Sequence, residues 1–274
     1  MRISASERQT TRPVKDQPSW ENFTAKWNGK AQVPATDPGS LDIKQSLGIA
    51  HWLAKGLFMS RAITGVVDIP SMRYLYSSGH VKEMVGWDDA LFWEHGVKFT
   101  YGKFHPDDLF ALHEFSTLIG HYYKNLPEEE RPAFTDYWDI RFAKPDGSYL
   151  RILEQGRVLK HDEAGNIIHL LIFVTDITHL KSENKNHLRL TNGKENVLYE
   201  YRMPGQKLIK LETPSEREVD VFRHISMGYT RKQIADRLGI SLSTVKTHCQ
   251  HVYEKLGTTD SVETLNLLKI WSML

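Results

Sequence analysis

Hydrophobic positions recur at helical spacing between Thr244 and Gly257. At about 100° per residue, the apolar side chains fall on one side of a helix, at spacings of four, three and four: Val245, Cys249, Val252 and Leu256. The other side carries polar side chains: Lys246, Thr247, Gln250 and Glu254. The pattern predicts an amphipathic helix whose apolar side is buried and whose polar side is exposed and available to bind a partner.

Signals for helix starts surround this segment. Two pairs fit the capping box, in which a hydroxyl and a carboxyl or amide group satisfy free backbone N–H groups: Ser215 with Glu218 and Thr230 with Gln233. Ser241 can cap a third helix, and Gly228 and Gly239 supply the breaks. The predicted helices lie near 215–227, 231–238, 242–256 and 261–272. The short turn before the third helix indicates a helix-turn-helix, whose second helix fits the DNA major groove.

The pattern between Ile63 and Thr178 is that of strands with fewer helices. Five runs are extended, rich in β-branched or aromatic residues: Ile63–Ile69, Arg73–Ser77, Tyr137–Phe142, Tyr149–Leu159 and Ile167–Val174. Pro106 begins a helix with Asp107 and Asp108 facing its N-terminal dipole. Short turns join the last three runs, so this part is predicted to be an α+β domain with an antiparallel sheet.

The remaining segments have weaker patterns. Residues 1–40 read as a loosely ordered arm with two tryptophans, Trp20 and Trp27, and an amphipathic helix is expected between Leu41 and Leu57. Residues 181–213 are a linker, either a hairpin packed between domains or an extended tether. The predicted units are therefore an arm (1–40), a sheet domain with its leading helix (41–180), the linker (181–213) and a helical domain (214–274).

Composition narrows the possible partners. The chain has 274 residues, enough for about two domains, and its 35 Lys and Arg nearly balance its 34 Asp and Glu. Any binding to nucleic acid must therefore come from a local patch. One cysteine excludes an internal disulfide, and the longest apolar run, Leu170 to Val174, is too short for a membrane span. We expect a cytoplasmic protein with no membrane partner.

The line PSEREVDVFRHISMGYTRKQIADRLGISLSTVKTHCQHVYEKLG resembles the LuxR/FixJ type of helix-turn-helix domain. The resemblance implies that Leu242 to Leu256 is the recognition helix and that the last helix can pair with its counterpart in a second subunit. The pieces YLYSSGHVKEMVGWDD, FHPDDL and DIRFAKPDGSYLRILEQGRVLKHDEAGNIIHLLIFV resemble, in this order, a PAS sensory domain. That family has a five-stranded antiparallel sheet with short helices across one face.

The candidate DNA-binding residues follow from the recognition helix. Lys246, Thr247 and Gln250 project away from the buried side, where lysine can reach guanine and glutamine can pair with adenine. Phosphate contacts are expected from the remaining candidates: Lys232, Ser243, Thr244, His248 and His251. From Pro214 to Leu274 eight Lys and Arg face seven Asp and Glu. So weak a positive balance favours a homodimer, through the PAS domain and the last helix, on a two-fold operator.

No cofactor is required by the sequence. The aromatic and histidine residues of the PAS region would permit haem or a flat ligand: His95, His105, His113, His121, Trp87, Trp93, Tyr122, Tyr123 and Trp138. The core can equally be filled and serve dimerisation. No nucleophile motif, phosphate loop or metal spacing indicates an enzyme. The main hypothesis is a bacterial DNA-binding regulator whose PAS domain senses a small molecule or sets dimer geometry, and the alternative is a PAS-based protein-interaction module without sequence-specific DNA binding.

Overall fold

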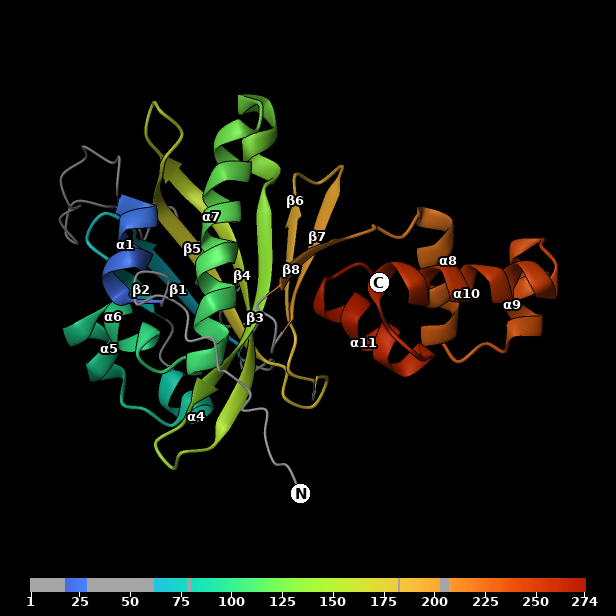
Figure 1. Ribbon diagram of the computed structural model, residues 1–274, viewed down its shortest axis with the longest axis horizontal. Coiled ribbons are helices and arrows are strands. Elements are labelled where there is room, and N and C mark those ends of the chain that lie inside the picture. Colours follow the sequence, from blue (N-terminus) through green and yellow to red (C-terminus); the bar gives the residue numbers. More distant parts are fainter. Residues whose placement is uncertain (1–17, 29–61, 78–79, 182, 203–206) are drawn as a thin grey trace, which may run out of the picture.

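The structure is a computed structural model that describes residues 18–28, 62–77, 80–181, 183–202 and 207–274. The helix expected between Leu41 and Leu57 lies outside these residues. Within them, a large antiparallel sheet with helices on one face is followed by a domain of four helices (Figure 1). This is the fold class expected from the sequence.

One sheet of eight strands forms the centre of the molecule, in the order β2-β1-β5-β4-β3-β6-β7-β8. Its strands are β1 (Ile63–Asp68), β2 (Arg73–Ser77), β3 (Thr135–Ala143), β4 (Tyr149–His161), β5 (Ile167–Asp176), β6 (Asn186–Thr191), β7 (Asn196–Arg202) and β8 (Lys207–Leu211). All neighbouring strands are antiparallel. We call residues 62–211 the sheet domain and residues 214–274 the C-terminal domain.

The expected number of five strands is wrong for this sheet, because β6, β7 and β8 extend it. β6 pairs with β3 from Thr135 opposite Thr191 to Trp138 opposite Leu188. In β6, Leu188 and Leu190 alternate with polar residues, and all six residues are buried. His187 and Arg189 of β6 face the C-terminal domain rather than solvent. Composition alone therefore suggests a linker where the chain forms a strand.

The inner face of the sheet is covered by helices, of which α7 (Leu109–Asn125) is the longest and lies over the central strands (Figure 1). Its apolar side chains Leu112, Phe115 and Ile119 are buried against the sheet domain's core. The smaller elements on this side are α1 (Trp20–Asn28), α4 (Val81–Val85), α5 (Asp89–His95), α6 (Val97–Tyr101) and the 3-10 helices η3 (Pro106–Asp108) and η4 (Glu128–Ala133). α1 packs on α7 through the buried Phe23, with Trp20 and Trp27 partly buried beside it.

Asp108 has a different role from the expected helix-capping one. Its side chain makes no capping hydrogen bond and is 1% exposed. Instead Arg141 donates to it from Nη2 at 2.5 Å, from Nε at 3.1 Å and from the backbone N–H at 2.9 Å. Burial would raise the pKa of Asp108, but these bonds from Arg141 lower it overall. The pair joins the start of α7 to β3, and His105 rather than an acid caps η3.

We expect Arg141→Ala to destabilise the protein by about 3 kcal/mol in urea unfolding, because it leaves the Asp108 carboxylate buried without its cation. Since the folded-state pKa of Asp108 is depressed, this stabilisation is present above the unfolded pKa of about 3.9 and lost as pH falls through the folded pKa. The difference between variant and wild type should therefore shrink in acid. Lys82→Ala, which breaks an exposed pair with Asp88, is the control and should change little. Equal effects of the two substitutions would contradict this role of Arg141.

Candidate nucleic-acid interface

The C-terminal domain contains four helices that begin where the sequence predicts: α8 (Glu216–Ser226), α9 (Arg231–Leu238), α10 (Leu242–Leu256) and α11 (Ser261–Ile270). Both expected capping boxes are present, at the starts of α8 and α9. Ser241 caps α10 by accepting a hydrogen bond from the backbone N–H of Thr244 at 3.0 Å. Gly239 ends α9 in the left-handed conformation, with φ of 64°, which sets the tight turn into α10.

The two sides of α10 differ as the sequence predicts. The predicted inward residues are all buried: Val245, Cys249, Val252 and Leu256. They pack with Phe222 of α8 and Ile234 of α9 in one hydrophobic cluster. Cys249 is 2% exposed and burial raises the pKa of its thiol, as expected for a small core residue rather than a reactive thiolate.

None of the eight candidate DNA-binding residues is buried. Six are exposed, namely Lys232, Ser243, Lys246, Thr247, Gln250 and His251, and two are partly buried, namely Thr244 and His248. Gln250 donates to Glu254 at 2.9 Å, one turn further along the same exposed side. This contact occupies the amide nitrogen of Gln250.

His251 lies closer to α8 than to the centre of the exposed side. Its Nδ1 is 3.7 Å from Oε1 of Glu218, whose other oxygen accepts from Lys255 at 2.7 Å. Glu218 therefore caps α8 and also binds Lys255 of α10, a contact that the sequence did not predict. The spacing of the capping box identifies Glu218, but nothing local indicates Lys255 as its partner 37 residues away.

The C-terminal domain rests on the outer face of the sheet. One hydrophobic cluster contains Leu153 of β4, Leu198 of β7 and Leu211 of β8 together with Leu267 and Trp271 from the end of the chain. Among the four helices of the C-terminal domain, Figure 1 shows α11 nearest the sheet and α9 most distant from it. The outer face is thus a docking platform for the helical domain.

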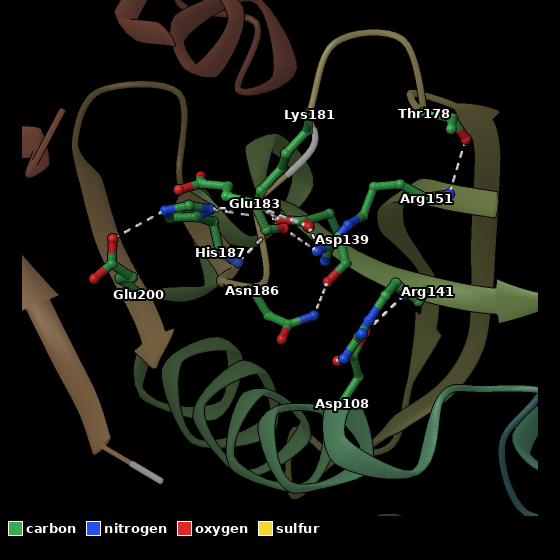
Figure 2. A network of polar contacts seen from close by, with 10 residues as sticks. All are labelled: Asp108, Asp139, Arg141, Arg151, Thr178, Lys181, Glu183, Asn186, His187 and Glu200. Atoms are coloured by element: carbon green, nitrogen blue, oxygen red, sulfur yellow. Dashed lines mark hydrogen bonds and ion pairs between the residues drawn. The ribbon is translucent and has the colours of Figure 1, made fainter. Parts of the chain in front are cut away.

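A buried polar network lies beside this platform (Figure 2). Asp139 of β3 is 1% exposed and accepts from Arg151 at 2.8 Å, from Lys181 at 2.8 and 2.9 Å, and from the backbone N–H of His187 at 2.9 Å. Burial would raise the pKa of Asp139, but Lys181, His187 and Arg151 hold it well below its usual value. The network fastens the connection between β5 and β6 onto the sheet.

Two side chains of β6 carry this network to the C-terminal domain. His187 lies 3.3 Å from Oε2 of Glu200 on β7, and its ring meets the edge of Trp271 at a centroid distance of 5.4 Å. Burial opposes ionisation of Glu200, but His187 and Arg202 lower its pKa to about 2. Arg189 donates to the backbone C=O of Trp271 and stacks over Tyr137 at 4.7 Å. The two contacts with Trp271 were not predicted, because they join residues about 80 positions apart.

The inner side of the sheet domain contains two small hollows, of about 60 and 70 Å³. Of the aromatic and histidine residues proposed as ligand contacts, Trp93 lines one hollow and Trp138 the other. Among the described residues, no histidine lines either hollow, so neither offers an axial imidazole to a haem. His113, which is buried elsewhere, binds the Tyr101 hydroxyl at 2.9 Å, and burial lowers its pKa to about 4.

Residues 213–268 match the family described as bacterial regulatory proteins, luxR family. The C-terminal domain is a LuxR-family helix-turn-helix domain. The matched segment starts just before the first capping box and ends within α11, so it includes the turn between α9 and α10 and the exposed side of α10.

Curated relatives are similar over part of their length. Fimbriae Z protein of Escherichia coli K12 is 27% identical over 120 residues, 43% of this chain and 52% of that protein. LiaR, a transcriptional regulatory protein of Bacillus subtilis, is 33% identical over 67 residues, 24% of this chain and 32% of LiaR. MalT, an HTH-type transcriptional regulator of Yersinia pestis, is 36% identical over 59 residues, 22% of this chain and 6% of MalT. The chain thus spans about half of the first relative and less of the others.

Solved structures show a distant likeness. VqmA of Vibrio cholerae, described as a LuxR-type receptor, covers 79% of this chain and 86% of its own, with 15% identity and a TM-score of 0.30. The N-terminal domain of a diguanylate cyclase with a PAS/PAC sensor from Marinobacter aquaeolei covers 43% of this chain and 96% of its own, with 20% identity and a TM-score of 0.34. Across the described part of the chain, no helix has both the length and the apolar character needed to cross a bilayer.

We expect Arg189→Ala to loosen the docking of the C-terminal domain, because it removes the bond to Trp271 without altering that domain's own core. The expected loss is about 2 kcal/mol in urea unfolding, as for a hydrogen bond to a charged group, with a larger radius of gyration in solution scattering. Arg189→Ala also removes a bond to Asn196 and the stacking over Tyr137, both within the sheet domain.

Arg157→Ala is the control for loss of an arginine–carbonyl bond, since the exposed Arg157 binds the Pro132 carbonyl within the sheet domain, and its radius should not change. An unchanged radius for Arg189→Ala would show that the hydrophobic cluster alone holds the domains together.

Proposed function

We propose that this protein is a bacterial DNA-binding transcriptional regulator, acting in the cytoplasm, in which a PAS-type sheet domain senses a small molecule or sets dimer geometry. The C-terminal domain binds a two-fold operator through α10 in the major groove. The observation that carries this proposal is the exposure of the polar side of α10 in a domain that matches the LuxR family.

The proposed contacts divide by chemistry. Lys246, Thr247 and Gln250 are the candidates for reading base edges, because they lie on the side of α10 away from its buried residues. Five flanking residues are the candidates for phosphate contacts: Lys232, Ser243, Thr244, His248 and His251. Lys246 is the strongest base-reading candidate, since no hydrogen bond or ion pair to a described residue occupies its amine.

The weak charge of the C-terminal domain supports a dimer on DNA. With eight basic and seven acidic side chains, one domain offers few net charges to the phosphate backbone. Two domains on one duplex bind with higher effective concentration than one. We propose that the dimer forms through the sheet domain and α11, and that it recognises a palindromic site.

The contact between the outer face of the sheet and the C-terminal domain supports a mechanism in which ligand binding in the sheet domain changes DNA binding. Asp139, His187 and Arg189 connect the sheet to Trp271 at the end of the chain, so a change in the sheet domain can alter how α11 rests on it. A ligand shifts the population of such arrangements only by its difference in affinity for them. In this mechanism the arrangement sets the spacing of the two recognition helices on the operator.

An interaction module without sequence-specific DNA binding is the second candidate. Three exposed apolar side chains of the C-terminal domain favour it: Met227, 62% exposed, Val262, 68% exposed, and Leu242, 43% exposed. Single exposed apolar residues are common on protein surfaces, so this support is weaker than the family match. The DNA selection below separates the two candidates.

Selection of bound fragments from random genomic DNA should return a motif with two-fold symmetry. At the selected site, Lys246→Ala should weaken binding by about 1 to 3 kcal/mol, because it removes a base contact. Binding to unrelated DNA should change less and should weaken with salt. Lys210→Ala, an exposed lysine of β8 in the sheet domain, is the control and should leave the selected affinity unchanged.

Recovery without any motif would favour the interaction module. A motif whose affinity is insensitive to Lys246→Ala would keep the regulator but remove Lys246 from the base-reading residues. Circular dichroism of each variant should match wild type, because both lysines are exposed.

A further inference from the structure

The two hollows of the sheet domain adjoin each other beneath the helices of the inner face. The same side chains line both: Tyr74, Thr100, Phe104, Glu154 and Ile172. Their volumes are about 60 and 70 Å³, and an apolar cavity of about 150 Å³ accepts benzene. Together they suit a molecule of about one ring, once the shared side chains move slightly aside.

The charged side chains that line the hollows are all acidic. Asp89 and Glu154 line the first, and Asp136 and Glu154 line the second. Among the described residues, no lysine, arginine or histidine lines either one. Surrounded by protein rather than water, such a set of groups attracts a cation strongly and repels an anion.

Asp136 of β3 is a buried carboxylate, and burial raises its pKa more than the N–H groups near it, on the Gly156 backbone and the Trp138 side chain, lower it. It is 1% exposed, and neither of its oxygens accepts a hydrogen bond with good geometry from a described residue. It lies over Gly156 of β4, where a Cβ atom would come within 2.4 Å of Oδ1, so this strand position must be glycine to leave room. A buried acceptor without a donor is costly and is rare in native proteins.

Glu154 lies beside Asp136 on the next strand. It stands opposite Trp138 in the register, two positions from the residue opposite Asp136, so both acids point to the inner face. Glu154 lines both hollows, which accounts for its partial accessibility although protein surrounds it. Beside it, the Tyr74 hydroxyl and Thr100 Oγ1 are 2.6 Å apart and bind each other.

The apolar lining is largely aromatic near these acids. Phe104 and Trp138 meet edge to face at 6.1 Å, and Phe92, Trp93 and Phe23 line the outer parts of the hollows. Aromatic faces attract organic cations through their quadrupole, and they attract neutral analogues much less.

We propose that the two hollows form a binding site for a small organic cation of about one ring, whose N–H groups bind Asp136 and Glu154 and whose apolar part packs on Phe104 and Trp138. The inference rests on the proposed sensory function and names the chemical class of the signal. Glu154 reaches both hollows, so it is the residue that holds the cation while Asp136 fixes its orientation.

Binding should release a proton. Burial raises the pKa of Asp136 to about 7, and burial together with Asp136 raises the pKa of Glu154 well above its usual value. The titratable groups facing these acids are Tyr74 of β2, Asp89 of α5 and the two acids themselves. α6 and α7 contribute only the hydroxyls of Thr100 and Ser116. Since a cation favours the ionised carboxylates, its affinity should rise as pH increases from about 6 to about 8.

The test is calorimetry on the full chain with three cations and their neutral isosteres: benzylamine with benzyl alcohol, tert-butylamine with tert-butanol, and methylguanidine with N-methylurea. At least one cation should bind at least ten-fold more tightly than its isostere. Titration in buffers of different ionisation enthalpy near pH 7 should show proton release. Asp136→Asn and Glu154→Gln should each weaken binding at least ten-fold, while Glu83→Gln on the exposed side of α4 should not.

Both acid variants keep the side-chain shape and replace a buried ionisable group with a neutral amide, so unchanged circular dichroism is expected. Equal affinity for cations and isosteres, binding unaffected by both acid variants, or no binding by any of the three cations would overturn the proposal. DNA binding by the ligand-free protein is measured separately. Intact DNA binding without cation binding refutes only the cation site, whereas absent DNA binding refutes the proposed function.

Discussion

A buried carboxylate stays ionised only while cations and N–H donors surround it. The carboxylate of Asp139 takes these partners from several elements of the sheet domain, so it constrains where those elements lie. Arg151 comes from β4, Lys181 from the connection after β5, and His187 from β6. Satisfying Asp139 therefore brings β6 beside β3 and lets the sheet continue through β7 and β8. The added strands β7 and β8 supply Leu198 and Leu211 to the face on which the C-terminal domain packs.

The position of that domain limits how a signal can act. α11 and Trp271 contact the sheet, whereas the polar side of α10 is exposed. Docking thus leaves the recognition helix accessible, and a ligand cannot work simply by uncovering it. What docking does fix is the orientation of α10 relative to the sheet domain, and orientation matters when two such helices must fit one duplex.

Local signals were sufficient for the C-terminal domain. Ser215, Thr230 and Ser241 start helices through contacts within three residues, so sequence spacing predicts them well. The exposed side of α10 followed from the same periodicity. In the sheet extension, β7 and β8 form the hairpin that was one of the two alternatives for residues 181–213. Strand β6 could not be read from local signals, because Asn186 and His187 are polar yet buried against partners distant in sequence. Asp136 and Glu154 were also missed. They come together only because β3 pairs with β4, and this pairing is not visible from local spacing.

The burial of α11 has a consequence for self-association. Leu267, Leu268 and Ile270 are buried within one chain, which leaves mainly Val262 and Lys269 of this helix open to solvent. If a second subunit pairs through the covered side, each contact made between subunits replaces one made within a chain. By mass action, dimerisation would then compete with docking of the C-terminal domain on the sheet. The concentration of the protein in the cell would by itself help to determine how firmly the C-terminal domain is held.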